Sequence, residues 1–289
     1  IIMGLVCFSS SLTAADWPQW RGPNRDAQSD EHLASTDWEN SPPKHLWTTE
    51  GFGEGFASVA VVKNILYTLG NTDGGQAVIA ANADDGSILW KKVITDANPK
   101  HSYEGSRCTP SVDGDRLYVV TSNGSIACLK SKNGDVVWQR QFKDWDGKMM
   151  SGWGYSESPL VDGDRVLCTP GGLNALVVCL DKMTGKEIWT CKPSFEGEAG
   201  KDGAGYSSIV VSNALGTKQY VQLTGKGLIG ISADHGKQLW TYNRVANPTA
   251  NIPTPIIDGN FVFASTSYGC GTCLVELKKD GDNIIAEEK

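Results

Sequence analysis

Short apolar runs alternate with turns rich in Asp, Asn and Gly along most of the chain, and the order of these runs repeats. Each repeat opens with a Ser or Thr directly before a short apolar run, at Ser58, Thr109, Ser158, Ser208 and Thr254. Three further runs follow in each unit, rich in β-branched and aromatic residues. Runs of this length, bounded by Asp-Gly and Asn-Gly turns, predict short β-strands joined as hairpins. The pattern therefore predicts four strands in each unit.

A second repeated feature is a glycine four residues ahead of a tryptophan. The tryptophans are Trp90, Trp138, Trp189 and Trp240, and successive ones are 48, 51 and 51 residues apart. One four-stranded sheet exposes both faces, so repeated sheets bury them by stacking around an axis, as the blades of a β-propeller do. We interpret these tryptophans as structural, because a large flat side chain would fill the wedge between neighbouring blades.

The expected fold is an all-β propeller over residues 50–289, with about five four-stranded blades. The blades would start near residues 58, 109, 158, 208 and 254, and the last would be incomplete. Residues 16–49 form an N-terminal segment with one strand near residues 46–48. The chain has 289 residues, of which 40% are hydrophobic and 20% charged, which is enough for a sizeable core.

Charge and composition exclude some functions. Lys and Arg number 26 against 33 Asp and Glu, a net charge of −7, so the basic excess of a nucleic-acid-binding protein is missing. Only four histidines are present, which argues against a histidine-rich metal centre. No apolar run is long enough to span a bilayer, so we expect no transmembrane segment in the mature chain.

Residues 1–15 are interpreted as the remnant of a secretory signal peptide. A short apolar stretch is followed by small residues, and Thr13 and Ala15 suit a cleavage site before Asp16. A buried N-terminal strand is the alternative. We therefore expect a soluble exported protein of the bacterial periplasm or cell envelope. Both ends of the sequence look cut, and we expect further residues beyond them.

The cleanest copy of the repeat, residues 178–189, resembles the repeat of the PQQ-like (pyrroloquinoline quinone) β-propeller superfamily, which is related to WD40-like propellers. That superfamily includes quinoprotein alcohol dehydrogenases and the outer-membrane assembly factor BamB. The opening motif, residues 16–26, is similar to the start of an exported bacterial subgroup. The resemblance implies a ring of seven or eight blades, from which these five would be truncated. In the alternative, residues 46–48 supply the outer strand of the last blade and five blades close the ring.

The resemblance also implies what a catalytic member would need. Quinoproteins pair PQQ with Ca²⁺ and often carry a disulfide between adjacent cysteines, but no two of the eight cysteines here are adjacent. Carboxylates such as Asp113 and Asp162 lie in predicted hairpin turns, and turn chemistry explains them. Cys270 and Cys273 have redox-motif spacing, yet packing as buried thiols explains them better. We assign no catalytic residue and no metal ligand.

The segments just before each first run carry aromatic and acidic residues and one arginine among glycines. The first strand of a propeller blade is innermost, so these segments would line one mouth of the central channel. The candidate binding residues there are Glu54, Phe56, Arg107, Trp153, Tyr155, Glu157, Tyr206 and Asn251. Alternatively, the glycines only permit close backbone approach at the axis and the aromatic side chains plug it.

The favoured function is a non-catalytic binding or scaffold module of the cell envelope that needs no cofactor. As in BamB-like members, it would interact with envelope or outer-membrane proteins, by loops or by strand edges that capture an extended segment. A small-molecule ligand at the channel mouth is a further expectation. The alternative is a PQQ- and Ca²⁺-dependent dehydrogenase of alcohols or sugars, in which Trp153 would stack on the quinone and Arg107 would bind its carboxylate or carbonyl. Carbohydrate capture is a third interpretation.

Overall fold

The computed structural model describes residues 15–32 and 35–289, whose strands form five antiparallel four-stranded sheets. The first sheet contains β1 (Ala60–Val62), β2 (Ile65–Thr72), β3 (Gly75–Asn82) and β4 (Ile88–Val93). The second contains β5 (Ser111–Asp113), β6 (Arg116–Thr121), β7 (Ser125–Lys130) and β8 (Val136–Gln141). The third contains β9 (Leu160–Asp162), β10 (Arg165–Cys168), β11 (Val177–Asp181) and β12 (Glu187–Cys191). The signal-peptide remnant expected over residues 1–15 lies almost wholly outside the described residues.

The last two sheets repeat the same order. The fourth contains β13 (Val210–Ser212), β14 (Gln219–Thr224), β15 (Gly227–Ser232) and β16 (Gln238–Tyr242). The fifth contains β17 (Ile256–Asp258), β18 (Phe261–Thr266), β19 (Gly271–Asp280) and β20 (Asn283–Glu288). Two short 3₁₀ helices, η1 (Phe142–Trp145) and η2 (Ala214–Gly216), are the only helices in the described ranges. No helix in this part of the chain combines the length and hydropathy that crossing a membrane requires.

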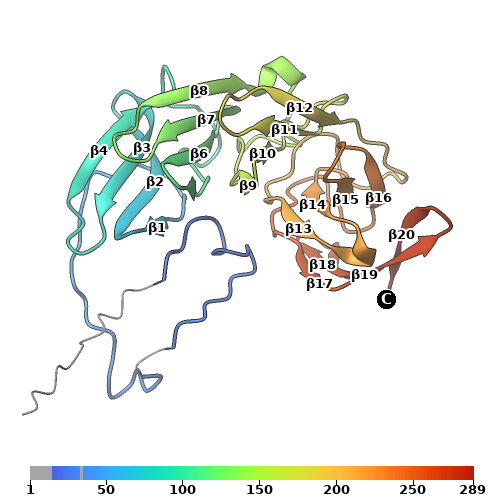
Figure 1. Cartoon of the computed structure of the whole chain (residues 1–289), viewed down its shortest axis with the longest axis horizontal. Coiled ribbons are helices and arrows are strands. Elements are labelled where there is room, and N and C mark those ends of the chain that lie inside the picture. The colour runs from blue at the N-terminus through green and yellow to red at the C-terminus, as the bar shows by residue number, and fades with distance from the viewer. Residues whose placement is uncertain (1–14, 33–34) are drawn as a thin grey trace, which may run out of the picture.

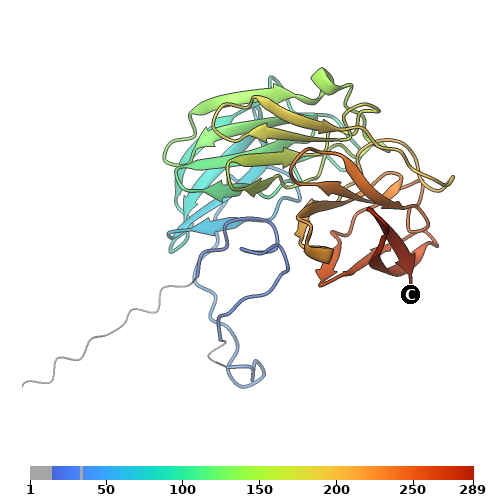
Figure 2. The same ribbon diagram turned by 45° about the vertical axis from the view of Figure 1, so that its right-hand side comes forward.

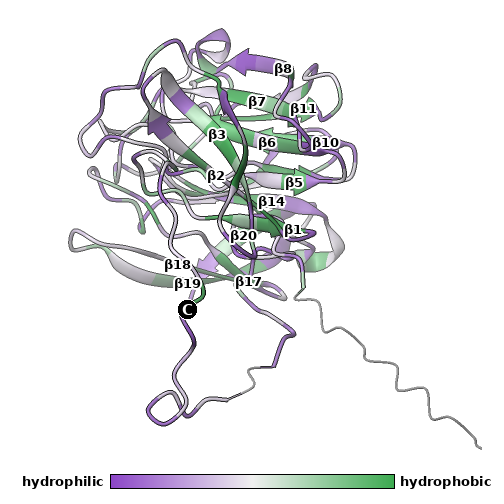
Figure 3. Ribbon diagram, turned by 90° about the vertical axis from the view of Figure 1, so that its left-hand side faces the viewer, coloured by the Kyte–Doolittle hydropathy of each residue, from purple (hydrophilic) through white to green (hydrophobic). Residues whose placement is uncertain are grey.

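The five sheets are blades that fan around a common axis, as expected for a propeller (Figures 1 and 2). The middle strands β3 and β7 are buried and apolar (Figure 3), whereas the outer strand β4 is largely exposed and the outer strand β8 is partly buried. The core therefore lies between neighbouring blades: one apolar cluster joins the first three, and two more join the third to the fourth and the fourth to the fifth.

The repeated tryptophan packs on the repeated glycine of the next blade. A Cβ atom added to Gly134 would lie 2.7 Å from the ring of Trp90, and one added to Gly185 would lie 2.6 Å from the ring of Trp138. Trp189 covers Gly236 in the same way. These three glycines have φ near +70°, a conformation that residues with a Cβ adopt at a cost. In the second and third blades, the glycine of the repeat thus contacts the tryptophan of the preceding blade, and the tryptophan contacts the glycine of the following blade.

Trp240 departs from this arrangement because the fifth unit has no Gly-x-x-x-Trp turn to receive it. Its ring lies over Gly230 of its own blade, and its indole N–H donates to Gln219 Oε1 at 2.6 Å. It still belongs to the apolar cluster between the fourth and fifth blades.

The fifth unit is complete in strands, and the expectation of an incomplete one is wrong. The tryptophan motif that marks the fourth strand of the other units is missing here, so β20 has no marker in the sequence. That strand pairs with β19 from Val275↔Glu288 to Asp280↔Asn283 and is the outer strand of the blade. Residues 46–48 therefore do not take this place, and the strand predicted there is not formed. Trp47 instead covers Gly86 of the first blade, and its indole N–H donates to the Ala83 carbonyl at 3.1 Å.

A chain of hydrogen bonds crosses the inner ends of the blades through the Ser and Thr that open each repeat, here called the anchor residues. The Thr109 amide donates to Ser158 Oγ at 2.9 Å, and the Ser158 amide donates to Ser208 Oγ at 3.0 Å. The Ser208 amide in turn donates to Thr254 Oγ1 at 3.4 Å. From the second blade to the fifth, the repeated hydroxyl thus ties the start of each inner strand to the one before it.

The opening motif lies at the axis of the fan, and we call residues 16–28 the N-terminal strap. Trp17 pairs with Val61 of β1 through two backbone hydrogen bonds of 2.7 and 2.9 Å, and the Pro18 carbonyl accepts from Val112 of β5 at 2.8 Å. The Trp20 indole N–H donates to Thr254 Oγ1 at 3.1 Å. The strap therefore contacts the first, second and fifth blades within four residues.

Candidate functional site

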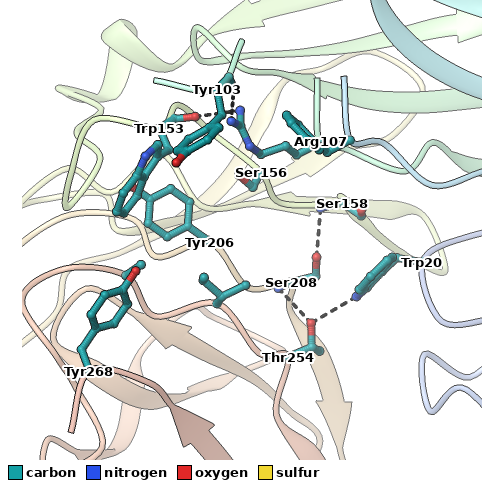
Figure 4. A pocket seen from close by; sticks show the side chains of 13 residues that line it. Trp20, Tyr103, Arg107, Trp153, Ser156, Ser158, Tyr206, Ser208, Thr254 and Tyr268 are labelled. Atoms are coloured by element: carbon teal, nitrogen blue, oxygen red, sulfur yellow. Dashed lines mark hydrogen bonds between the residues drawn. The ribbon is translucent and has the colours of Figure 1, made fainter. Parts of the chain in front are cut away.

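A cavity of about 440 Å³, here called the mouth cavity, opens where the segments leading into the five inner strands converge. Its walls are aromatic side chains, one arginine and small hydroxyl residues (Figure 4). The lining residues are Trp20, Phe56, Tyr103, Arg107, Trp153, Ser156, Ser158, Tyr206, Ser208, Ala250, Ile252, Thr254 and Tyr268. All five blades and the strap contribute to it.

Arg107 carries the positive charge of the cavity and is held by backbone carbonyls. Nη1 donates to Gly105 at 3.1 Å and to Trp153 at 2.9 Å, and Nη2 donates to Ser102 and Tyr103. Its guanidinium also lies 5.3 Å from the centre of the Phe56 ring. Burial lowers the pKa of Arg107, yet an arginine stays protonated at neutral pH. A fixed cation thus faces the cavity with neutral partners.

The aromatic wall is held rigid opposite Trp20. The rings of Trp153 and Tyr206 lie 5.8 Å apart at an angle of 59°, and the Tyr206 hydroxyl is 2.6 Å from Ser151 Oγ. Tyr103 and Tyr268 are exposed at the rim. On the other side, Trp20 and the anchor residues make the hydrogen-bonded floor shown in Figure 4. Such a cavity suits a ligand with an apolar or planar body and an acceptor or anionic group.

Four of the eight predicted mouth residues line this cavity: Phe56, Arg107, Trp153 and Tyr206. The other four lie elsewhere. Glu54 is exposed, and its backbone pairs with Asn71. Tyr155 is buried against Phe142, with ring centres 4.8 Å apart, and its hydroxyl donates to the Pro170 carbonyl.

Glu157 and Asn251 point away from the cavity into the structure. Glu157 is 2% exposed and accepts from the Thr169 amide at 2.6 Å, from the Thr169 hydroxyl at 2.8 Å and from Gln222. Burial raises its pKa to about 7, against the effect of these hydrogen bonds. The Asn251 amide donates to the carbonyls of Thr224 and Gly225. Both are structural groups in this fold.

The alternation of side chains along the extended segments before the anchor residues explains which predicted residues line the mouth cavity. Successive side chains of extended backbone point to opposite sides, so every second residue faces the axis. The residue two positions before each anchor lines the cavity in all five blades: Phe56, Arg107, Ser156, Tyr206 and Ile252. Glu157 is one position before its anchor and Asn251 three, which puts both on the opposite side. The axis-facing position can therefore be found from the sequence alone, by counting two residues back from each anchor residue.

Trp20 and Tyr268 are cavity residues that sequence analysis missed. Trp20 belongs to the opening motif, which carries no signal for a place at the axis. Tyr268 lies between β18 and β19, far from the segments that precede the anchors. Both reach the mouth through contacts between blades and strap, which a repeat pattern does not encode.

A family model described as outer membrane protein assembly factor BamB matches residues 25–151 and 97–283, two overlapping ranges that cover most of the chain. The chain belongs to this PQQ-like, BamB-like family. The outer membrane protein assembly factor BamB of Alteromonas naphthalenivorans is 29% identical over 219 residues, which are 67% of this chain and 50% of that protein. The one of Shewanella oneidensis is 26% identical over 129 residues, 43% of this chain and 28% of that protein. The chain thus spans half or less of the length of these BamB relatives.

A solved structure supports the propeller fold of this BamB-like chain. The quinohemoprotein alcohol dehydrogenase of Comamonas testosteroni superposes with a TM-score of 0.59 at 15% identity, over 91% of this chain and 45% of that one. At this identity the likeness concerns the fold alone.

The mouth cavity lacks the ligands that a quinoprotein needs for PQQ with Ca²⁺. Calcium takes six to eight oxygen ligands, among them carboxylate and amide groups. No lining residue is Asp, Glu, Asn or Gln, and the side chains there offer only hydroxyl oxygens. Within the described ranges, no three His, Cys, Asp or Glu side chains cluster to hold a metal. The side chains of this BamB-like cavity therefore do not fit a calcium-bound quinone.

The cysteines of the described residues are free thiols. Cys108, Cys128, Cys168, Cys179, Cys191 and Cys273 are buried, and burial raises the pKa of each of these six thiols. Cys270 is exposed, so the packing expected for this thiol is wrong, and its Sγ lies 3.3 Å from the Ala246 carbonyl oxygen. Buried thiols of raised pKa are poor nucleophiles, in line with the packing role expected for Cys273.

Proposed function

We propose that this chain is a non-catalytic protein-binding module of a bacterial cell envelope and that the mouth cavity receives a segment of its partner. The observation that carries the proposal is the lining of that cavity: aromatic walls and one fixed guanidinium, with no carboxylate, imidazole or thiol among the lining side chains. These residue types dominate the energy of protein interfaces. General acid-base catalysis, in contrast, relies most often on His and on the carboxylates of Glu and Asp, none of which lines this cavity.

Family membership supports the same function. The relatives matched in sequence are named as outer membrane protein assembly factors. We therefore place the partner among proteins of the outer membrane or of its assembly machinery, and the module in the periplasm. The expected contact is an apolar or aromatic partner side chain between Trp153 and Trp20, with a carbonyl or carboxylate oxygen on Arg107.

Site-specific cross-linking tests this proposal. A photoreactive phenylalanine analogue replaces Tyr268 at the rim, and a matched one replaces Met183, which is exposed on a turn of the third blade. We expect position 268 to cross-link one outer-membrane assembly protein in envelope extracts, and Arg107→Gln together with Trp153→Ala to abolish the product. Equal cross-linking from position 183, or a product that survives both substitutions, would contradict the proposal.

The PQQ-dependent dehydrogenase is the second candidate, because a planar anionic ligand would also suit aromatic walls and Arg107. The lining lacks the carboxylates that would hold its calcium. Titration of PQQ with Ca²⁺, followed by tryptophan fluorescence, separates the two functions. A flat titration on folded protein is expected. Saturable quenching that requires Ca²⁺ and is lost in Arg107→Gln would favour the dehydrogenase.

A further inference from the structure

A second cavity, here called the axial cavity, lies between the strap and the inner strands of the last two blades. Its volume is about 430 Å³. It is lined by Arg21, Asn24, Arg25, Asp26, Gln28, Val210, Val211, Ser212, Asn213, Pro255, Ile256, Ile257, Gly259 and Asn260. The axial cavity shares no residue with the mouth cavity, so a ligand here is independent of the proposed function.

The backbone along this cavity has unused hydrogen-bonding groups. In a two-residue hairpin the pair next to the turn is hydrogen-bonded, so the following residue of the edge strand directs its N–H and C=O away from the sheet. Ile257 of β17 holds this position, since Asp258↔Phe261 flanks the turn. A longer loop, residues 213–218, joins β13 to β14, but Val211 has the same place in the register: it follows the first pair, Ser212↔Gln219, as Ile257 follows Asp258↔Phe261. Among the described residues, no backbone group from outside their sheets pairs with either one.

In the first two blades, the strap forms hydrogen bonds with the equivalent backbone groups of the inner edge strands. Trp17 exchanges two backbone hydrogen bonds with Val61, the middle residue of β1, and the carbonyl of the next residue, Pro18, accepts from Val112, the middle residue of β5. One extended dipeptide of the strap therefore closes two adjacent inner edges. The same geometry recurs around the axis at Val211 and Ile257, where the strap does not pair.

Arg25 adds a buried cation to this cavity. It is 3% exposed, and its three hydrogen bonds go to the neutral oxygens of Gln19, Ser158 and Pro159. Its Nε–H has no partner. Arg21 also lines the cavity, and Asp26 offsets only one of the two positive charges. The hydrogen bonds of Arg25 therefore leave its positive charge without an anionic partner, and a carboxylate in the cavity would be attracted to the two guanidinium groups.

We propose that the axial cavity binds an extended acidic peptide segment of a partner protein. One residue of the segment exchanges backbone hydrogen bonds with Val211, and the carbonyl of its next residue accepts from Ile257, as Trp17 and Pro18 do at β1 and β5. An acidic side chain of the segment faces Arg21 and Arg25. Strand addition of this kind draws affinity from the main chain and specificity from alternate side chains.

The test uses the full chain and a synthetic five-residue peptide, acetyl-Glu-Val-Glu-Val-Glu-amide, in calorimetric titrations. Ile257→Pro and Val211→Pro each remove one free N–H from an edge strand, where proline is tolerated. We expect each to weaken binding about three- to tenfold, the usual effect of one hydrogen bond. Val161→Pro is the matched control in the middle of β9, outside this cavity, and should bind as the unchanged protein does.

The charge of the site has its own test. Arg21→Gln leaves the strand edges intact, and we expect weaker peptide binding with a smaller dependence on salt. A peptide with Lys for Glu, and one with N-methylated valines, should both fail to bind. Absence of saturable binding would overturn the proposal. Equal binding of the N-methylated peptide, or unchanged binding in both proline variants with intact β-sheet circular dichroism, would overturn it as well.

Discussion

Between successive blades from the first to the fourth the same contact recurs, whereas at the axis every blade presents a different side chain. Trp90, Trp138 and Trp189 each close on a glycine of the following blade. The axis-facing residues before the anchors are instead Phe56, Arg107, Ser156, Tyr206 and Ile252. The repeat therefore specifies the fold, while the departures from the repeat shape the mouth cavity.

The largest effect is expected at the repeated contact. In Gly185→Ala, the new Cβ would lie 2.6 Å from the Trp138 ring at a φ of +69°, so overpacking adds to backbone strain. We expect the free energy of unfolding to fall by about 3 kcal/mol. Gly163→Ala is the control, with a φ of +58° and nothing within 4 Å, and should lose about 1 kcal/mol. Urea denaturation measures both, and equal losses would show that strain alone matters.

The next largest effect on stability is expected at Glu157, whose side chain points away from the mouth cavity. Its unfolded carboxyl ionises near pH 4.5 and its folded carboxyl near pH 7, so the folded state keeps a proton that the unfolded state has released. Stability should therefore fall as pH rises from about 4.5 to about 7. Glu157→Gln cannot ionise, and relative to wild type it should gain on the order of 1–3 kcal/mol between pH 4.5 and pH 8.

Denaturation of both proteins at these two pH values measures the difference. Comparison with wild type removes the contributions of other titrating groups. A difference that does not change with pH would show that Glu157 is already ionised in the folded protein.

The anchor hydroxyls provide a smaller, matched pair of substitutions. Ser158→Ala removes the acceptor of the Thr109 amide and should cost about 1–2 kcal/mol. Thr109→Val removes a buried hydroxyl that has no partner, and should be neutral or slightly stabilising. Thermal unfolding compares the two. If Thr109→Val lost as much stability as Ser158→Ala, the Thr109 hydroxyl would have a hydrogen-bond partner in the folded protein.

The smallest effect on stability is expected at the mouth. Tyr103 is 74% exposed, so Tyr103→Ala should change the free energy of unfolding by less than about 0.5 kcal/mol. Cross-linking from position 268 should nevertheless weaken, because Tyr103 lines the cavity. A mouth substitution that destabilised the protein as Gly185→Ala does would remove the distinction between the two regions.

The same distinction explains how far the sequence could be interpreted. The blades, the tryptophan wedges and the position of the mouth follow from repeats, and Phe56 and Arg107 lie where predicted. Glu157 was assigned to the mouth from its residue type, without the phase of the extended backbone. Trp20 could not be placed, since its contact with Thr254 depends on how the fan curves and not on any local pattern.

The strap has a consequence for the order of folding. Trp20 hydrogen-bonds to Thr254, a residue 234 positions later in the chain. Within each blade, by contrast, strands pair with their immediate neighbours in sequence. Local hairpins close quickly, and contacts across long separations carry the larger entropic cost. During synthesis from the N-terminus, the strap leaves the ribosome before the blades and reaches its full set of partners only after the fifth blade has formed.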